Sequence, residues 1–122
     1  MIDDEQQIVN MFWKYLTGMG FYVTGVTGSI DALKIFREQP DSFHLVITDL
    51  TMPQMSGERL AEEIIKIRPD IPIIMCTGYT SDIINEENMK AAGIRKLIRK
   101  PVSVAEITEA IREVLFPPET ER

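Results

Sequence analysis

Cysteine is nearly absent from this chain of 122 residues, in which Cys76 is the single example. One thiol excludes an intrachain disulfide framework and a metal site built on paired cysteines, and it fits a reducing compartment. Cysteines are buried more often than most residues and behave as small apolar side chains. We therefore interpret Cys76 as part of the core.

Long apolar runs are also missing. No stretch approaches the roughly 18 apolar residues that a membrane span requires, and the N-terminus lacks the basic start and apolar stretch of a secretory signal. We therefore expect a cytoplasmic location and no membrane contact by this segment.

Basic side chains are outnumbered, because 13 Lys and Arg stand against 19 Asp and Glu, for a formal net charge of -6. The basic residues are scattered along the chain, whereas a nucleic-acid surface requires clustered positive charge. Direct binding of nucleic acid is therefore not expected. A content of 44% hydrophobic and 26% charged residues, at this length, is typical of one folded domain.

Apolar periodicity predicts alternating strands and helices. Short β-branched runs predict strands over Phe21 to Val26, Leu45 to Thr48, Ile71 to Met75 and Ile94 to Ile98. Helical spacing predicts helices from Ile8 to Met19, after an N-cap at Ser29, from Gly57 to Pro69, around Ile83 to Ala91, and after the capping box Ser103 to Glu106. Continuous apolar strands between amphipathic helices predict a doubly wound parallel α/β domain.

Folds of this kind place their sites at the carboxyl ends of the strands. The polar residues expected there are Asp3, Asp4, Asp49, Thr77 and Lys100. Converging carboxylates repel one another unless a cation neutralises them, and hard oxygen ligands suit Mg²⁺ or Mn²⁺. With such a cation, Asp49 can act as a nucleophile toward a phosphoryl donor, while Thr77 and Lys100 contact the phosphoryl oxygens.

Four strings carry a resemblance to a known family: DDE at 3–5, DLTMPQMSG at 49–57, TG at 77–78 and KP at 100–101. Their order and spacing resemble the receiver domains of response regulators and hybrid histidine kinases, over essentially the whole chain. The resemblance implies a flavodoxin-like (β/α)5 fold with a five-stranded parallel sheet and a phosphoryl group carried by an aspartate.

The resemblance also implies a role for each matching residue. Asp49 resembles the phosphoacceptor, Asp4 a direct metal ligand, Asp3 a carboxylate that acts mainly through water, and the Thr51 carbonyl a backbone ligand. Thr77 and Lys100 resemble the phosphoryl contacts, and the peptide bond between Lys100 and Pro101 is expected to be cis.

Each of these residues has an ordinary structural explanation as well. Asp3 and Asp4 can cap a helix. Asp49 and Thr77 can be turn residues, and Lys100 can be a solvated charge. The joint pattern in a parallel α/β frame favours the functional explanation. His44, the single histidine, is interpreted as structural.

The chain departs from the family pattern in two places. Met1 and Ile2 alone precede Asp3, where a receiver has a longer apolar strand, so the first strand is expected to be truncated. Leu97 occupies the position at which many receivers carry an aromatic residue, which puts an aromatic switch in doubt.

The predicted function is that of a phosphoacceptor in two-component signal transduction or a phosphorelay. The expected partner is a histidine kinase or a histidine phosphotransfer domain, and the receiver domain is expected over 1–116, with a tail at 117–122. The strings IPIIMCTGY and GIRKLIRKP favour the C-terminal receiver of a hybrid sensor histidine kinase.

The alternatives are a free-standing single-domain regulator and a flavodoxin-like binding module without phosphorylation. A phosphatase with an aspartyl nucleophile is disfavoured, because its DxD pattern would need an acid where Thr51 stands. A receiver domain is expected to catalyse its own phosphorylation and dephosphorylation. The sequence does not decide whether this one belongs to a kinase polypeptide. The lifetime of its phosphoryl group is expected to be long, because the two positions that govern it in the family are occupied by Thr51 and Tyr79.

Overall fold

The computed structural model describes residues 1–78 and 93–116. In chain order the elements are α1 (Gln6–Gly18), α2 (Ser29–Glu38), a short 3-10 helix (Pro40–Ser42), β1 (Val46–Asp49), α3 (Gly57–Ile67), β2 (Ile73–Thr77), β3 (Ile94–Arg99) and α5 (Val104–Leu115). The helix predicted around 83–91, the tail at 117–122 and Tyr79 lie outside the described residues.

The sheet is parallel, with strand order β1-β2-β3. Isolated parallel bridges join Ile2 to Val26 on one side and to Thr48 of β1 on the other. The sheet therefore continues beyond β1 through Ile2 and then Val26. The resulting order, Val26, Ile2, β1, β2 and β3, is that of the predicted doubly wound five-stranded fold. Of the strand expected over Phe21 to Val26, the regular pairing is confined to Val26.

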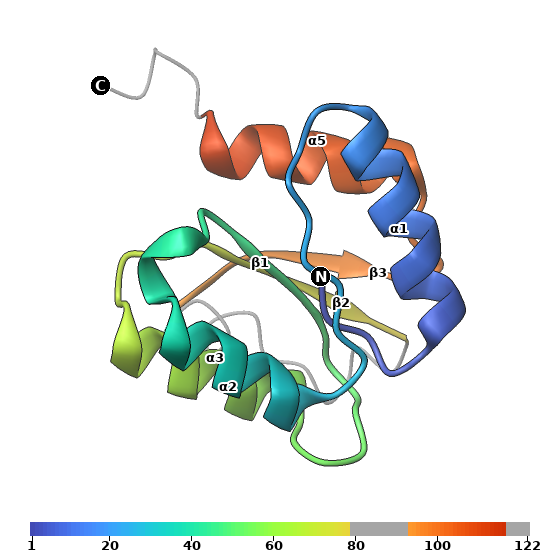
Figure 1. The fold of residues 1–122 in the computed structure, drawn as a ribbon. Helices are drawn as coiled ribbons and strands as arrows, with labels where there is room; N and C mark the ends of the chain where they lie inside the picture. Colours follow the sequence, from blue (N-terminus) through green and yellow to red (C-terminus); the bar gives the residue numbers. More distant parts are fainter. Residues whose placement is uncertain (79–92, 117–122) are drawn as a thin grey trace.

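Helices cover both faces of this sheet. Figure 1 shows α1 and α5 together on one face and α2 and α3 together on the other. Two clusters of buried apolar side chains correspond to these two layers: one includes Phe12, Ile74 and Ile107, and the other includes Phe36, Leu60 and Ile73. This packing leaves the carboxyl ends of the strands as the edge at which polar groups gather.

The predicted helix caps had different outcomes. The capping box at Ser103 and Glu106 is confirmed, with both reciprocal hydrogen bonds formed. The N-cap prediction at Ser29 was wrong, because Gly28 is the extended residue before α2 and Ser29 is already helical. The Ser29 hydroxyl is buried and has no hydrogen-bond partner within the described residues. It therefore does not satisfy a free N–H at the start of the helix.

The first helix buries Val9 and Phe12 against the sheet. Leu16 is buried, whereas Tyr15 and Met19 are about half exposed. None of the helices in the described part of the chain combines the length and the apolar character that crossing a bilayer requires.

Candidate functional site

Four backbone segments converge at the carboxyl edge of the sheet. The N–H of Asp49 donates to the carbonyl of Ile2 at 2.9 Å, and the N–H of Lys100 donates to the carbonyl of Thr77 at 2.7 Å. These two bonds, together with the pairing of β1 with β2, join the ends of neighbouring segments. The side chains at the ends of β1 and β2, and those that directly follow Ile2 and β3, therefore meet at one place. The sequence-predicted residues Asp3, Asp4, Asp49, Thr77 and Lys100 all line one cleft of about 890 Å³.

The three aspartates form a compact cluster. One carboxylate oxygen from each of Asp3, Asp4 and Asp49 lies within 4.8 Å of the others. Asp3 and Asp49 are buried, with 1% and 6% of their surface exposed, whereas Asp4 is exposed. Two carboxylates of the cluster are therefore held inside the protein, and the third is accessible to solvent.

Lys100 bridges the two buried carboxylates. Its Nζ lies 3.0 Å from Asp3 Oδ2 and 3.2 Å from Asp49 Oδ1, and its side chain is 21% exposed. The peptide bond between Lys100 and Pro101 is cis, as predicted. A charge held between two buried carboxylates does not have the geometry of a solvated surface lysine, which was the ordinary explanation for this residue.

The charges of this cluster shift one another's titration. Burial raises the pKa of Asp49 above its ordinary value and Asp3 adds to this, while Lys100 offsets part of the effect. For Lys100, burial alone would lower the pKa, but the hydrogen bond and charge of Asp3, together with Asp49, outweigh it and raise the pKa. Lys100 is thus held in the charged form by the carboxylates that it contacts.

The helix-cap explanation for the acidic pair is not what the structure has. The N-cap of α1 is Glu5, and no side chain makes a capping hydrogen bond there. Asp3 instead accepts a hydrogen bond from the Glu5 N–H at 2.9 Å through Oδ1, which leaves Oδ2 for Lys100. The orientation of Asp3 is therefore fixed from both of its oxygens.

Thr77 and Thr51 occupy different positions in the cleft. Thr77 is the last residue of β2 and is buried, whereas Thr51 lies in the loop after β1 and is exposed. Both line the cleft. An apolar rim borders it on the side of α1 and of the segment after β3, formed by Ile8, Met11, Pro101 and Val102.

The donor set fits a divalent cation of the magnesium type. Three carboxylates supply hard oxygen donors from within 4.8 Å of one another, and one of the three residues is exposed. Lys100 supplies one positive charge to this group, which leaves net negative charge at the cluster. The residues present therefore suit Mg²⁺ or Mn²⁺.

Gly57 is a site-supporting residue to which the sequence analysis gave no role. Its N–H donates to the Leu50 carbonyl at 2.7 Å, and an added Cβ would overlap the carbonyl oxygen of Asp49. The signal was present in the sequence, because Gly57 follows Ser56, the N-cap of α3, and closes the loop that begins after Asp49. Periodicity alone assigns that glycine to a helix start and does not reveal the contact.

Cys76 and His44 lie outside the chemistry of the cluster. Cys76 is buried, and burial raises the pKa of its thiol to about 12, so the thiol stays protonated. This agrees with its predicted place in the core. His44 is exposed and precedes β1, at the opposite end of that strand from Asp49.

Comparison with known proteins gives one consistent family. The family model described as response regulator receiver domain matches residues 1–112. The chain is 28% identical to the sensor kinase CckA of Brucella abortus, over 94% of this chain but 12% of that protein. It is also 28% identical to the response regulator receiver protein CpdR of the same organism, over 95% of this chain and 94% of that protein.

A solved structure agrees with these relatives. The response regulator receiver domain protein of Clostridium thermocellum superposes with a TM-score of 0.85 at 35% identity, covering 92% of this chain and 88% of that one.

Proposed function

The chain belongs to the response regulator receiver domain family of two-component signalling, and on that premise we propose that it accepts a phosphoryl group on Asp49. The observation that carries the proposal is the position of Lys100, whose Nζ contacts both Asp3 and Asp49 in a cleft that is open to solvent. The ammonium group of Lys100 can pair with the free carboxylate and then with a phosphoryl group attached to it.

In the proposed reaction an Asp49 carboxylate oxygen attacks the phosphorus of a phosphohistidine. A new P–O bond forms, the P–N bond breaks, and the released imidazole takes up a proton. Asp49 must be ionised to attack, and Lys100 favours that form against burial and the charge of Asp3. Thr77 at the end of β2 donates its hydroxyl hydrogen to a phosphoryl oxygen in this scheme.

Asp3, Asp4, Asp49 and the backbone carbonyl of Thr51 are the groups that would hold Mg²⁺. When bound, the ion would neutralise charge between the carboxylates and the incoming phosphoryl group. The division between a buried Asp3, oriented by Glu5 and Lys100, and an exposed Asp4 supports different roles for the two. We assign direct coordination to Asp4 and an outer position to Asp3.

The proposed partner is a histidine kinase or a histidine phosphotransfer domain. The apolar rim of Ile8, Met11, Pro101 and Val102 next to the acidic cluster supports docking of a protein rather than of a small ester alone. We propose that residues 1–116 form the receiver and that 117–122 are a tail.

The receiver of a hybrid sensor histidine kinase is our preferred setting, and the similarity to the sensor kinase CckA supports it. The similarity to CpdR over nearly its whole length favours a free-standing regulator as the second candidate. Transfer from phosphorylated Asp49 to an isolated histidine phosphotransfer domain distinguishes the two. Rapid transfer in both directions is expected of a phosphorelay receiver, and transfer onto Asp49 alone is expected of a free-standing regulator.

Intact mass after incubation with Mg²⁺ and acetyl phosphate tests phosphorylation directly. The parent should gain one phosphoryl group, and Asp49→Asn should gain none, because an amide is a poor nucleophile. The exposed Asp41→Asn on the short helix before β1 is the matched control and should be labelled like the parent. Equal labelling of Asp49→Asn and Asp41→Asn would overturn the assignment.

A further inference from the structure

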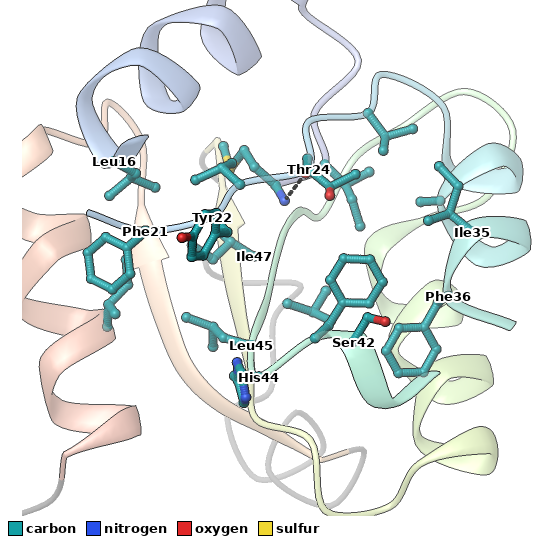
Figure 2. A pocket seen from close by; sticks show the side chains of 18 of the residues that line it. Leu16, Phe21, Tyr22, Thr24, Ile35, Phe36, Ser42, His44, Leu45 and Ile47 are labelled. Atoms are coloured by element: carbon teal, nitrogen blue, oxygen red, sulfur yellow. Dashed lines mark hydrogen bonds between the residues drawn. The ribbon is translucent and has the colours of Figure 1, made fainter. Parts of the chain in front are cut away.

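Two cavities of the structure differ in charge. One has a volume of about 330 Å³, and none of the three clustered aspartates lines it. Figure 2 shows apolar side chains on its walls, among them Leu16, Phe21 and Leu45. No carboxylate, lysine or arginine side chain is among the described residues that line it. Charged side chains are found instead in the cleft of about 890 Å³ that holds Asp49.

The cleft around Asp49 is strongly negative. Lys100 is the one basic side chain among the described residues that line it. The acidic side chains of the lining are those of Asp3, Asp4, Glu5, Asp49 and Glu58. Five carboxylates and one ammonium group leave a formal charge of -4, and a divalent cation bound at the aspartates would reduce this to -2.

Glu5 and Glu58 are the two carboxylates of this lining that lie outside the aspartate cluster. Glu5 is the N-cap of α1 and is exposed, whereas Glu58 lies in the first turn of α3 and is partly buried. Because α1 and α3 cover opposite faces of the sheet (Figure 1), the two residues border the cleft from opposite sides. A phosphodonor that enters the cleft therefore meets the charge of both.

Neither of these two charges is neutralised by a neighbour. Glu63, which lies further along α3, shows the contrast, since its carboxylate is 3.6 Å from Arg59 Nε and 3.0 Å from Lys66 Nζ. No ion pair of Glu5 or Glu58 is found in the part of the chain that the structure describes. Their full charge therefore acts on what enters the cleft.

We propose that Glu5 and Glu58 select the phosphodonor by its charge, so that the cleft favours a phosphoryl group that arrives with positive charge beside it over a free phosphoryl anion. This inference rests on the proposed function of Asp49 and names the class of its donor. Like charges raise the energy of the encounter, and the walls of a cleft weaken the screening by water. A cationic group next to the phosphoryl group pairs with the glutamates instead.

The competing explanation is that the two glutamates are ordinary charges at helix starts. Acidic side chains stabilise the N-terminus of a helix through its dipole, and the position of Glu58 in the first turn of α3 fits this role. Such charges would stabilise the helix without affecting the choice of donor. The two explanations therefore differ in whether the charge of the donor matters.

Two small phosphodonors of different charge separate the explanations. Near neutral pH acetyl phosphate is a dianion, whereas phosphoramidate carries an ammonium group on phosphorus and is a monoanion. Attack by Asp49 forms the same P–O bond with either donor. Acetyl phosphate loses acetate with the electron pair of its broken P–O bond, and phosphoramidate loses ammonia with the electron pair of its P–N bond. The product is the same, so intact mass follows both reactions.

Glu5→Gln and Glu58→Gln should each raise the second-order rate of labelling by acetyl phosphate about threefold, at saturating Mg²⁺ and otherwise low ionic strength. The rate with phosphoramidate should change less than about twofold, because a monoanion is repelled less than a dianion. The gain with acetyl phosphate should disappear in about 1 M salt, where charges are screened within ~3 Å.

Glu62→Gln is the matched control. Glu62 is exposed on α3 and is not among the residues that line the cleft, so its replacement removes the same charge from the same helix. This variant should be labelled like the parent by both donors.

The outcomes separate this inference from the proposed function. Unchanged labelling by acetyl phosphate in both Glu5→Gln and Glu58→Gln, or an equal gain with the two donors, would overturn selection by charge and leave Asp49 as the phosphoacceptor. Failure of both donors to label the parent would instead overturn the phosphoacceptor assignment, and this inference with it.

Discussion

Gly57 lies directly against the main chain of Asp49. A Cβ added at Gly57 would overlap the carbonyl oxygen of Asp49 and would stand 2.8 Å from the sulfur of Met75. The Gly57 N–H meanwhile holds the Leu50 carbonyl at 2.7 Å. The first residue of α3 therefore fixes the position of the backbone at the end of β1.

Gly57→Ala should lower the free energy of unfolding by about 1–3 kcal/mol, because the added methyl group forces the backbone of Asp49 or the side chain of Met75 to move. The same movement displaces the Asp49 carboxylate from Lys100, so labelling by acetyl phosphate should slow as well. Chemical denaturation and intact mass measure the two effects.

Gly18→Ala is the matched control. Gly18 ends α1, and an added Cβ there has open space around it. Alanine in that position should leave stability unchanged or slightly raised, because glycine is the poorer helix residue. Similar losses in both variants would mean that the contact with Asp49 is not the cause.

The sequence predicted most of the arrangement from which this site is built. The residues Asp3, Asp49, Thr77 and Lys100 were each expected at a strand end, and parallel topology alone brings such ends to one edge. The structure places them in one cleft. The capping box at Ser103 was predicted because its signal is local, consisting of two side chains and two N–H groups within four residues.

Features that depend on contacts between residues far apart in the sequence could not be predicted from local patterns. The strand expected from Phe21 to Val26 has the right composition, but pairing is confined to Val26, where Ile2 is its neighbour. The N-cap expected at Ser29 failed because its side chain turns into the interior. Whether a segment of strand-forming residues pairs in a sheet, or a serine caps a helix, depends on the neighbours that it meets in the fold. Sequence periodicity does not contain that information.

Asp4→Ala should separate metal binding from the stability of the metal-free fold. Asp4 is exposed and lies beside two buried carboxylates, so its removal relieves repulsion without breaking the contacts of Lys100. Mg²⁺ should raise the free energy of unfolding of the parent, by about 2.7 kcal/mol at a concentration 100 times Kd, and thermal unfolding measures this. The variant should respond much less and should be at least as stable without metal.

Asp3→Ala is the informative comparison. It removes the acceptor of the Glu5 N–H and one partner of Lys100, so the metal-free variant should itself be destabilised. If Asp4→Ala kept the full response to Mg²⁺, direct coordination by Asp4 would be excluded.

The charge of Asp49 should give a pH signature in the metal-free protein. Burial and Asp3 raise its pKa in the folded state, with Lys100 as a partial offset. A carboxyl group of this kind contributes stability below its unfolded pKa and loses that contribution as the pH rises through its folded pKa. Metal-free Asp49→Asn should therefore be more stable than the parent at neutral pH.

This difference should shrink as the pH falls toward the ordinary aspartate value of about 3.9, because the parent then carries a proton on Asp49. Urea unfolding at several pH values, with a chelator present, measures it. A difference that stayed constant across this range would reflect packing of the amide and not the charge of the carboxylate.

The lifetime of the phosphoryl group is the prediction that bears most directly on the role of the domain. In the receiver family this lifetime depends on the residues two positions after the phosphoacceptor and two positions after the threonine, which here are Thr51 and Tyr79. Thr51 is exposed in the loop after β1, beside Asp49 in the cleft, whereas Tyr79 lies outside the described residues.

Hydrolysis requires a water molecule placed in line behind the phosphorus, and a carboxylate or amide side chain can orient it. Threonine is too short for that task, and tyrosine carries neither group. We therefore expect slow loss of the phosphoryl group in the presence of Mg²⁺, which suits a domain that stores the group or passes it to a histidine. Thr51→Asn should shorten the lifetime, and Thr51→Asn combined with Tyr79→Glu should shorten it further.

Decay after removal of the donor, followed by intact mass at a saturating Mg²⁺ concentration, measures the lifetime in the parent and in both variants. Saturation with Mg²⁺ is needed because a change in metal affinity at Thr51 would otherwise imitate a change in water positioning. Serine at position 51, in Thr51→Ser, is the matched control, since it keeps the backbone carbonyl and a short hydroxyl side chain and should decay like the parent. Decay of the parent as fast as that of the double variant would mean that these two side chains do not control access of water, and storage would lose its physical basis.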